Sequence, residues 1–192
     1  MDAPMLSGIV LAGGASRRMG RDKALLTYEG EPLVARAARL LSAACDDVIL
    51  ASGDGRRLGG LGLGLTEVAD TAAGAGPLGG IIAGLETVRH LLVAVVAVDM
   101  PDLSVAVLGD LAARWDGRSP AIVPRAAGRL EPLHAVYSRL AAPELRAALE
   151  AGERSVHRVL EALGAQVVDL GLTTGAFARN LNAPGDLYGP VR

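Results

Sequence analysis

The chain has 192 residues, of which 51% are hydrophobic and 21% are charged, and its formal net charge is −2. This composition predicts a globular protein that is long enough to bury a core as one domain spanning 1–192. Only 3% of the residues are aromatic. Stacking platforms for single-stranded nucleic acid are therefore not expected, and the slight negative charge argues against non-specific DNA binding.

Cys45 is the single cysteine, which excludes an internal disulfide and a cysteine-based metal site. A lone cysteine favours a reducing compartment. The N-terminal residues do not follow the pattern of a signal peptide. The longest apolar run, at 91–98, is too short to span a bilayer. We therefore expect a cytoplasmic protein with no membrane partner.

The first half of the chain alternates short apolar runs with polar or amphipathic segments. A buried strand is predicted at 8–11, followed by a cationic loop, a helix at 31–44 with Pro32 in its first turn, and a strand at 47–51. Residues 53–64 are rich in glycine and are predicted to form a flexible connection. A short strand is then predicted at 65–68.

The second half continues this alternation, and its run at 91–98 is apolar on both faces, as expected of a central parallel strand. The elements predicted here are, in chain order, a helix at 78–90, the strand at 91–98, a helix at 105–115, a hairpin of 121–124 with 134–138, helices at 144–150 and 156–163, and a strand at 166–170. The pattern predicts an α/β fold with three layers: a doubly wound, mostly parallel sheet with a small antiparallel hairpin.

Directly after the first predicted strand, two glycines open a strongly cationic segment. Gly13 and Gly14 are followed by four cations within seven residues: Arg17, Arg18, Arg21 and Lys23. Adjacent glycines let backbone N–H groups approach an anion, and arginine forks and a mobile lysine suit phosphate oxygens. The spacing matches neither the Walker A loop nor the dinucleotide-binding loop. A triphosphate site is predicted, with a solvated basic turn as the alternative.

Asp99 ends the strand predicted at 91–98, and Pro101 prevents its simple continuation. Ligands of doubly wound sheets bind at the carboxyl ends of the strands. The residues alone leave two roles open for this carboxylate: a ligand of Mg²⁺, or a cap of the following turn or helix. Asp70 and the glycines of 76–80 are further candidates for ligand contacts at this edge of the sheet. The alternative for Asp70 is an ordinary loop acid, and the alternative for the glycines is tight helix packing.

Six motifs together resemble one family. The segment "LAGGASRRMGRDK" (11–23) resembles the signature of nucleotidyltransferases with a dinucleotide-binding-like fold, and the set as a whole resembles the molybdenum cofactor guanylyltransferases. The other motifs, in the family's order, are "GPLGGI" (76–81), "VDMP" (98–101), "EPLHAVY" (131–137), "AGERSV" (151–156) and "NLNAPGDL" (180–187). The implied fold is that of the nucleotide-diphospho-sugar transferases.

The resemblance implies transfer of GMP from GTP to the terminal phosphate of molybdopterin, with release of pyrophosphate and with Mg²⁺, or Mn²⁺ in its place. Arg18 and Lys23 would stabilise phosphate charge and Asp99 would hold the metal. The implied nucleotide contacts are Leu11, Ala12, Gly13, Gly14, Lys23, Asp70, Gly76, Pro77, Leu78 and Asp99. The implied contacts of the second substrate are Asn180, Asn182, Arg154 and His134, with structural roles as their alternatives. Cofactor-supplying and cofactor-accepting proteins are the implied partners.

Other functions stay open on the sequence alone. The related cytidylyltransferases typically read "LAAG" where this chain reads "LAGG" (11–14), so the difference falls at Gly13. Another small-molecule nucleotidyltransferase is a further alternative, and a non-catalytic nucleotide-binding domain would be expected to lose Lys23 or Asp99. One departure concerns "ASGDG" (51–55), where the guanylyltransferases often show asparagine.

Overall fold

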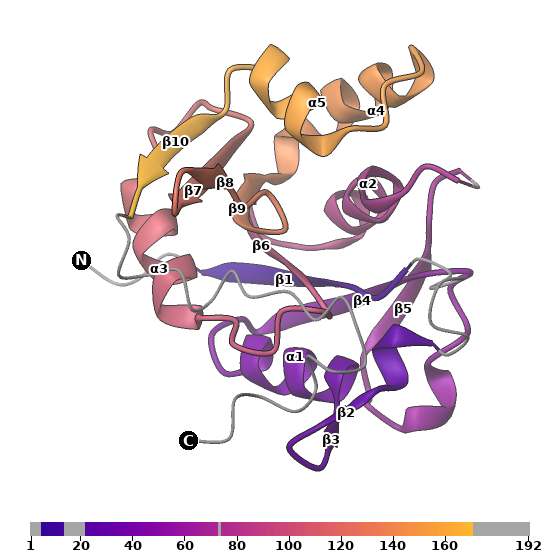
Figure 1. Cartoon of the computed structure of the whole chain (residues 1–192). Helices are drawn as coiled ribbons and strands as arrows, with labels where there is room; N and C mark the ends of the chain where they lie inside the picture. Colours follow the sequence, from indigo (N-terminus) through magenta and orange to yellow (C-terminus); the bar gives the residue numbers. More distant parts are fainter. Residues whose placement is uncertain (1–4, 14–21, 73, 171–192) are drawn as a thin grey trace.

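A computed structural model describes residues 5–13, 22–72 and 74–170 (Figure 1). One sheet runs through this part of the chain in the order β10-β7-β9-β6-β1-β4-β5, with β8 paired to β7. Its strands are β1 (Leu6–Leu11), β4 (Asp47–Gly53), β5 (Thr66–Ala69), β6 (Leu92–Ala97), β7 (Ala121–Ala126), β8 (Arg129–Leu130), β9 (His134–Ser138) and β10 (Gln166–Asp169). The two short strands β2 (Thr27–Tyr28) and β3 (Glu31–Pro32) pair separately.

The sheet is mostly parallel, as predicted. β1 pairs in parallel with β4 and β6, β4 with β5, and β10 with β7. Two strands are exceptions: β9 runs antiparallel to both of its neighbours, β6 and β7, and β8 runs antiparallel to β7. The carboxyl ends of β1, β4 and β6 therefore meet at one edge of the sheet.

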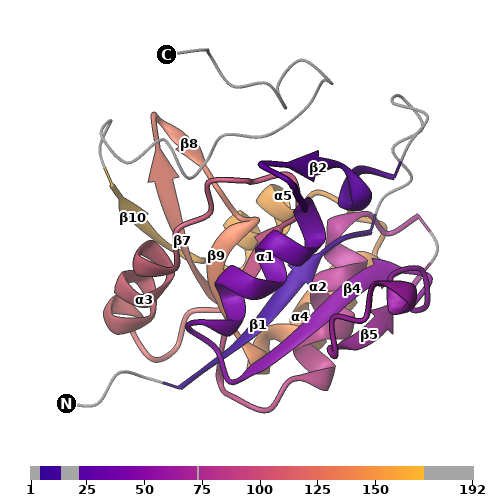
Figure 2. The ribbon, with the colours of Figure 1, turned by 90° about the horizontal axis from the view of Figure 1, so that it is seen from below.

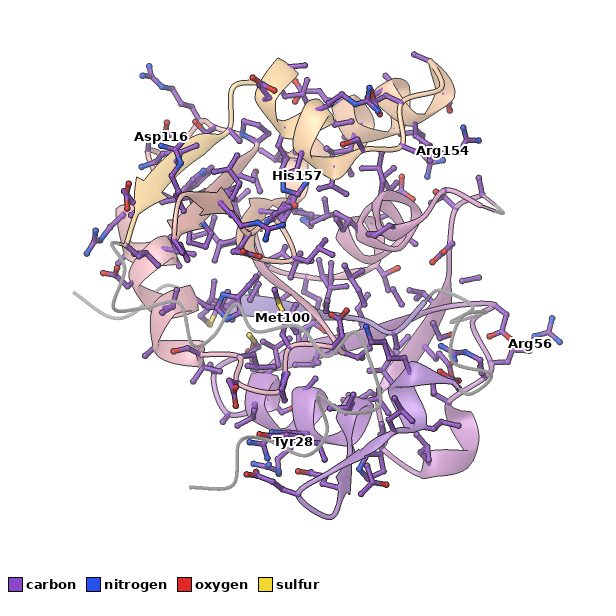
Figure 3. All side chains as sticks on the ribbon, in the orientation of Figure 1. Tyr28, Arg56, Met100, Asp116, Arg154 and His157 are labelled. Carbon is purple, nitrogen blue, oxygen red and sulfur yellow. The ribbon has the colours of Figure 1, made fainter. Side chains whose placement is uncertain are left out.

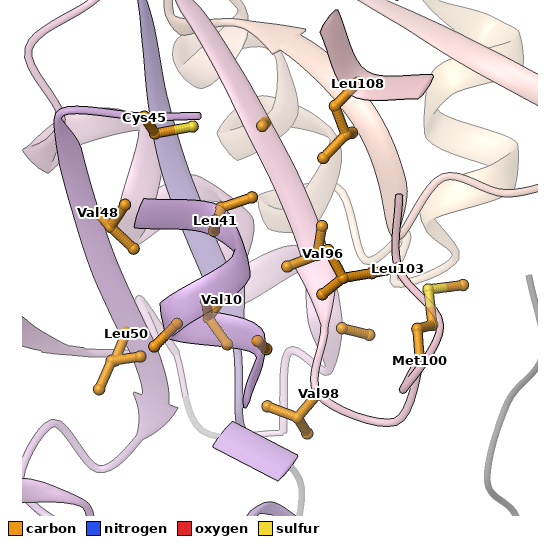
Figure 4. Close-up of a cluster of buried hydrophobic side chains, with 14 of the residues drawn as sticks. Val10, Leu41, Cys45, Val48, Leu50, Val96, Val98, Met100, Leu103 and Leu108 are labelled. Carbon is orange, nitrogen blue, oxygen red and sulfur yellow. The ribbon is translucent and has the colours of Figure 1, made fainter. Parts of the chain in front are cut away.

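Helices cover both faces of the sheet and make three layers (Figures 1 and 2). α1 (Leu33–Ser42) and α3 (Val105–Arg114) pack on one face, and α2 (Pro77–Thr87), α4 (Ala142–Glu150) and α5 (Val156–Ala162) pack on the other. The strands are apolar on both faces: Val10 and Val96 join the core under α1 (Figure 4), whereas Ile9 and Val95 join the core under α2.

Two glycines let the helices approach the first strand closely. A Cβ on Gly8 would lie 2.6 Å from Cδ2 of Leu41 in α1, and a Cβ on Gly84 in α2 would lie 2.4 Å from Cδ1 of Ile9. Real side chains do not come so close, so any larger residue would push the helix away from the sheet. Gly84 therefore serves the packing of α2 against β1.

Several predicted boundaries differ from the structure. The helix expected at 31–44 begins only at Leu33, because Glu31 and Pro32 pair with β2 around a turn in which Glu29 and Gly30 have positive φ. The helix expected at 78–90 ends at Thr87, since Val88 is extended. The hairpin is confirmed as β7 paired with β9, but the short strand β8 also folds back on β7. Among the described helices, none is long and apolar enough to cross a membrane.

Candidate active site

A cavity of about 230 Å³ opens where β1, β4 and β6 end. Its walls come from the residues just past these strands, from the first turn of α2 and from the segment that carries Lys23. The lining residues are Leu11, Ala12, Gly13, Lys23, Ala51, Asp70, Gly76, Pro77, Gly80, Ala97, Val98, Asp99 and Leu133. Eight of the ten residues with a predicted nucleotide contact are therefore brought together here.

Lys23 and Asp99 meet in this cavity although they are 76 residues apart in sequence: Lys23 Nζ lies 2.9 Å from Asp99 Oδ2. Lys23 opens the 3-10 helix η1 (Lys23–Leu25), and Asp99 lies two residues after the end of β6 at Ala97. Their side chains keep 19% and 26% exposure. Both groups are therefore ordered by each other and still accessible from the cavity, so either can exchange its partner for a ligand.

Asp70 supplies the second carboxylate of the cavity. Its backbone N–H donates to the carbonyl of Gly53, 3.0 Å away, which fixes it beside the end of β4. Burial raises the pKa of its carboxyl group above the usual value. Its side chain also lies against glycine backbone, because a Cβ on Gly80 would be 3.3 Å and a Cβ on Gly13 would be 3.5 Å from Asp70 Oδ1. A ligand that donates a hydrogen bond here would relieve the cost of the buried charge.

The first turn of α2 closes the cavity. Gly76 caps this helix with φ +63°, a conformation that favours glycine, and Pro77 occupies the first turn, where its missing N–H costs nothing. Gly76 has no side chain that could cap this end of the helix. The positive end of the helix dipole suits an electron-rich ligand atom.

The side chains of three predicted site residues, Leu78, His134 and Arg154, do not line the cavity. Leu78 is fully buried in the core under α2, so only its backbone is near the site. His134 is also fully buried, and its Nε2 accepts a hydrogen bond from the N–H of Ser104 at 3.0 Å. Burial lowers the pKa of His134 to about 4, so the imidazole is neutral at pH 7. Its side chain offers no surface to a substrate and instead supports the loop that carries Asp99.

Arg154 is exposed in the loop between α4 and α5 (Figure 3), and its Nε donates to the carbonyl of Gly74 at 3.2 Å. It therefore braces the loop before α2 rather than lining the cavity. The predicted site residues Gly14, Arg18, Asn180 and Asn182 lie outside the described residues.

The donors of the cavity fit a hard divalent cation that is shared with a substrate. No group of three or more His, Cys, Asp or Glu side chains within 5–13, 22–72 and 74–170 could hold a metal alone. Mg²⁺ typically binds through one or two carboxylates and completes its shell with substrate phosphates and water. Asp99, with Asp70 in the same cavity, provides that kind of incomplete oxygen set.

Sequence reasoning missed two features of the site. Ala51 and Ala97 line the cavity. Their signal was available, because both are small residues in the last two positions of the strands predicted at 47–51 and 91–98. The second feature is Arg57, whose side chain reaches from the glycine-rich segment 53–64 to Ala12 and Asp22. Nothing in the local sequence indicates that contact.

A glycine-walled cavity with a lysine–aspartate pair at the carboxyl edge of a doubly wound sheet is the site of a nucleotide-binding α/β protein. The class can be narrowed by comparison. The chain belongs to the MobA-like NTP transferase family, whose model matches residues 8–167. It is thus a nucleotidyltransferase, and the resemblance found in the motifs is confirmed.

The relatives extend over nearly the whole chain. A protein from Chloroflexus aggregans named probable molybdenum cofactor guanylyltransferase is 38% identical, with 95% of this chain and 92% of that protein covered. A protein of the same name from Opitutus terrae is 41% identical over 84% of this chain and 81% of its own length. The crystal structure of molybdopterin-guanine dinucleotide biosynthesis protein A from Archaeoglobus fulgidus superposes with a TM-score of 0.78 at 28% identity, covering 95% of both chains.

Proposed function

We propose that this chain, acting as one domain over 1–192, transfers GMP from GTP to the terminal phosphate of molybdopterin and releases pyrophosphate. The family and the names of the relatives support guanylyl transfer. The observation that carries the proposal is the meeting of Lys23 and Asp99 inside the cavity, since it joins a phosphate-binding cation to a metal-binding anion. The expected compartment is the cytoplasm, in keeping with the single buried free thiol of Cys45.

The protein forms no covalent bond with either substrate in this reaction. An oxygen of the molybdopterin phosphate forms a bond to the α-phosphorus of GTP, and the bond from that phosphorus to the β-phosphate oxygen breaks. The nucleophile is already an anion, so no general base is needed. Catalysis then consists of bringing two anions together and stabilising the charge that develops on the phosphate oxygens. Lys23 supplies that positive charge, and the motif resemblance adds Arg18.

A divalent cation held by Asp99 supplies Lewis-acid polarisation of phosphate oxygens when it is bound. We propose Mg²⁺, with Mn²⁺ able to replace it. Lys23 then exchanges its bond with Asp99 for a phosphate oxygen of GTP. Because the pair is already formed, both groups are placed before the substrate arrives.

The nucleoside would be held largely by backbone. Gly13, Gly76 and Gly80 present main chain to the cavity without a side chain in the way, and Asp70 offers an acceptor to a nucleoside donor. The second substrate would approach from the side of Asn180 and Asn182, as the motif resemblance implies. His134 is buried and makes no contact with the substrate. Arg154 acts on the loop around Gly74.

The decisive experiment incubates the protein with molybdenum cofactor, Mg²⁺ and each of the four nucleoside triphosphates, and identifies the pterin product by mass spectrometry. We expect the guanine dinucleotide with one pyrophosphate released per product. Removal of divalent cations with a chelator should stop the reaction, and Mg²⁺ or Mn²⁺ should restore it. A cytosine product would assign the chain to the cytidylyltransferases, and GTP binding without pyrophosphate release would make it a non-catalytic binder.

A further inference from the structure

The side chain of Arg57 joins two points that lie on either side of the cationic segment. Its Nη2 donates to the carbonyl of Ala12, and its Nη1 forms an ion pair with Oδ2 of Asp22. Ala12 follows β1 and Asp22 immediately precedes Lys23, so one guanidinium connects the residues that flank 13–21. The arginine itself comes from 53–64, which the sequence predicted to be a flexible connection.

Arg57 is itself well anchored. The carboxylate of Asp54 accepts the backbone N–H of Arg56 at 3.1 Å and that of Arg57 at 3.0 Å. The next residue, Leu58, has a buried side chain, and its N–H donates to Glu67 Oε1 at 3.0 Å. A side chain of Arg57 is therefore presented from a hydrogen-bonded loop, and only 27% of it is exposed.

The contacts continue from Arg57 into the proposed catalytic pair. Asp22 caps η1, since its Oδ1 accepts the N–H of Ala24 at 3.0 Å while its Oδ2 faces Arg57. Lys23 is the first residue of η1 and pairs with Asp99. At the other end, Ala12 is fixed to β4 through its N–H, which donates to the carbonyl of Ala51 at 2.8 Å. Arg57 thus sets the distance between the end of β1 and the start of η1.

We propose that Arg57 is a positioning residue for nucleotidyl transfer, which holds Asp22, and through it Lys23, in register with the end of β1. This inference rests on the proposed function. It also explains why the cationic motif contains one acid: the negative charge of Asp22 is paired with Arg57 and does not oppose the incoming phosphates. Two different nitrogens of the planar guanidinium serve the carbonyl and the carboxylate, whereas the three donors of a lysine sit on one nitrogen, which cannot occupy both positions.

The test compares Arg57→Ala, Arg57→Lys and Asp22→Asn with Arg56→Ala. Arg56 is the matched control because it is the neighbouring arginine, shares the Asp54 contact through its backbone, and is exposed at the edge of the molecule (Figure 3). Misplacement of a catalytic group by about 1 Å can cost about 10²-fold in rate. We expect Arg57→Ala to lower kcat at saturating GTP by about 10²-fold, Arg57→Lys to restore little of it, and Arg56→Ala to stay within about twofold of the parent protein.

The double variant Arg57→Ala with Asp22→Asn separates a positioning role from direct phosphate contact. If Arg57 acts through Asp22, the double variant is no slower than the worse single variant, because both changes break the same connection. If the two losses multiply, Arg57 acts independently of Asp22 and the inference is wrong. It is also wrong if Arg57→Ala lowers only the melting temperature and leaves kcat of the folded protein unchanged.

Equilibrium GTP binding keeps this test separate from the test of the proposed function. If the parent protein forms the guanine dinucleotide but Arg57→Ala is equally fast, the inference fails and the function stands. If the parent protein forms no dinucleotide, the function fails, and the inference is judged on binding alone. Arg57→Ala must then weaken GTP binding at least about tenfold relative to Arg56→Ala, and an equal affinity overturns the inference.

Discussion

Aspartates lie at both ends of the central strands, but their hydrogen bonding differs between the amino end and the carboxyl end. At the amino end, Ser7 of β1 donates its hydroxyl to Asp47 at 2.8 Å and accepts the N–H of His90 at 3.0 Å, and Asp47 accepts the N–H of Arg89 at 2.7 Å. At the carboxyl end, Asp70 has no side-chain hydrogen bond to another residue among those described, and Asp99 pairs with Lys23 inside an open cavity.

The pKa values of the two partly buried aspartates, Asp47 and Asp70, show the same difference. Burial alone would raise the pKa of Asp47, but the N–H of Arg89, the Ser7 hydroxyl and nearby positive charge lower it below its usual value. Burial raises the pKa of Asp70, and no hydrogen bond from a described residue offsets this effect. An aspartate at the amino end is thus a structural anchor whose bonds are complete. An aspartate at the carboxyl end can still accept a bond from a ligand. Substitutions at the amino end should therefore lower stability, and substitutions at the carboxyl end should lower activity.

The largest effect is expected at Lys23. Lys23→Ala should slow GMP transfer by roughly 10²–10³-fold, equivalent to about 3–4 kcal/mol of transition-state stabilisation. Stability should change by at most about 1 kcal/mol, because the pair with Asp99 is partly exposed. Pyrophosphate release at saturating GTP measures the first effect and urea unfolding the second. Turnover within a few-fold of the parent protein would remove Lys23 from the proposed chemistry.

The next effect concerns the metal. Asp99→Asn keeps the shape of the side chain but removes the charge that would attract Mg²⁺, and metal charge stabilisation is worth several kcal/mol. We expect a loss of roughly 10²-fold at ordinary Mg²⁺, with partial recovery at high Mg²⁺ or with Mn²⁺. A titration of activity against each metal measures this, with Asp102→Asn as the neighbouring control. Full activity of Asp99→Asn at ordinary Mg²⁺ would contradict the ligand assignment.

At the amino end of the strands, a substitution is expected to lower stability and to leave catalysis unchanged. Asp47→Ala removes the acceptor for Ser7 and Arg89 and should destabilise the fold by about 1–3 kcal/mol. The folded-state pKa of Asp47 is lowered, so its contribution is present above the unfolded value of about 3.9 and is lost as the pH falls through the folded value. Urea unfolding at several pH values measures this difference. Catalysis by the folded variant should be unchanged, and a loss of kcat would contradict the separation of the two ends.

A smaller effect is expected on the preference for GTP over CTP when Gly13 is replaced. A mismatched base leaves polar groups unpaired, so GTP is expected to exceed CTP at least about tenfold in kcat/KM, equivalent to about 1.4 kcal/mol. A Cβ at Gly13 would lie 3.3 Å from the backbone N of Gly53, which is tighter than most real Cβ contacts, so the backbone at this edge of the cavity would have to shift. Gly13→Ala should therefore narrow the preference by weakening GTP. Competition between the two nucleotides, with Gly109→Ala as the control in open space, tests this; an unchanged ratio would exclude Gly13 from base recognition.

The sequence predicted the carboxyl edge well because its signals are local. An apolar run followed by Gly13, or by Asp99, already places a residue at the end of a strand, and periodicity supplies the sheet and the helices around it. The missed features depend on contacts between distant segments. Arg57 lies in a stretch whose glycines indicate a loop, and only the fold shows that its guanidinium meets Ala12 and Asp22. His134 has the chemistry of a ligand contact, and only its position in β9 shows that it is buried.

The smallest expected effect is a gain in stability at Asp70. Its raised pKa means that the folded state resists the ionised form, so the charge destabilises the fold above the folded-state pKa. Asp70→Asn removes that charge with little change in shape, and should raise the melting temperature slightly at pH 7 while slowing GMP transfer. The gain should shrink as the pH falls through the folded value and vanish below the unfolded one, opposite to the trend at Asp47. Thermal unfolding at pH 7 and at acidic pH measures it. A variant less stable than the parent at pH 7 would show that Asp70 is a structural anchor like Asp47.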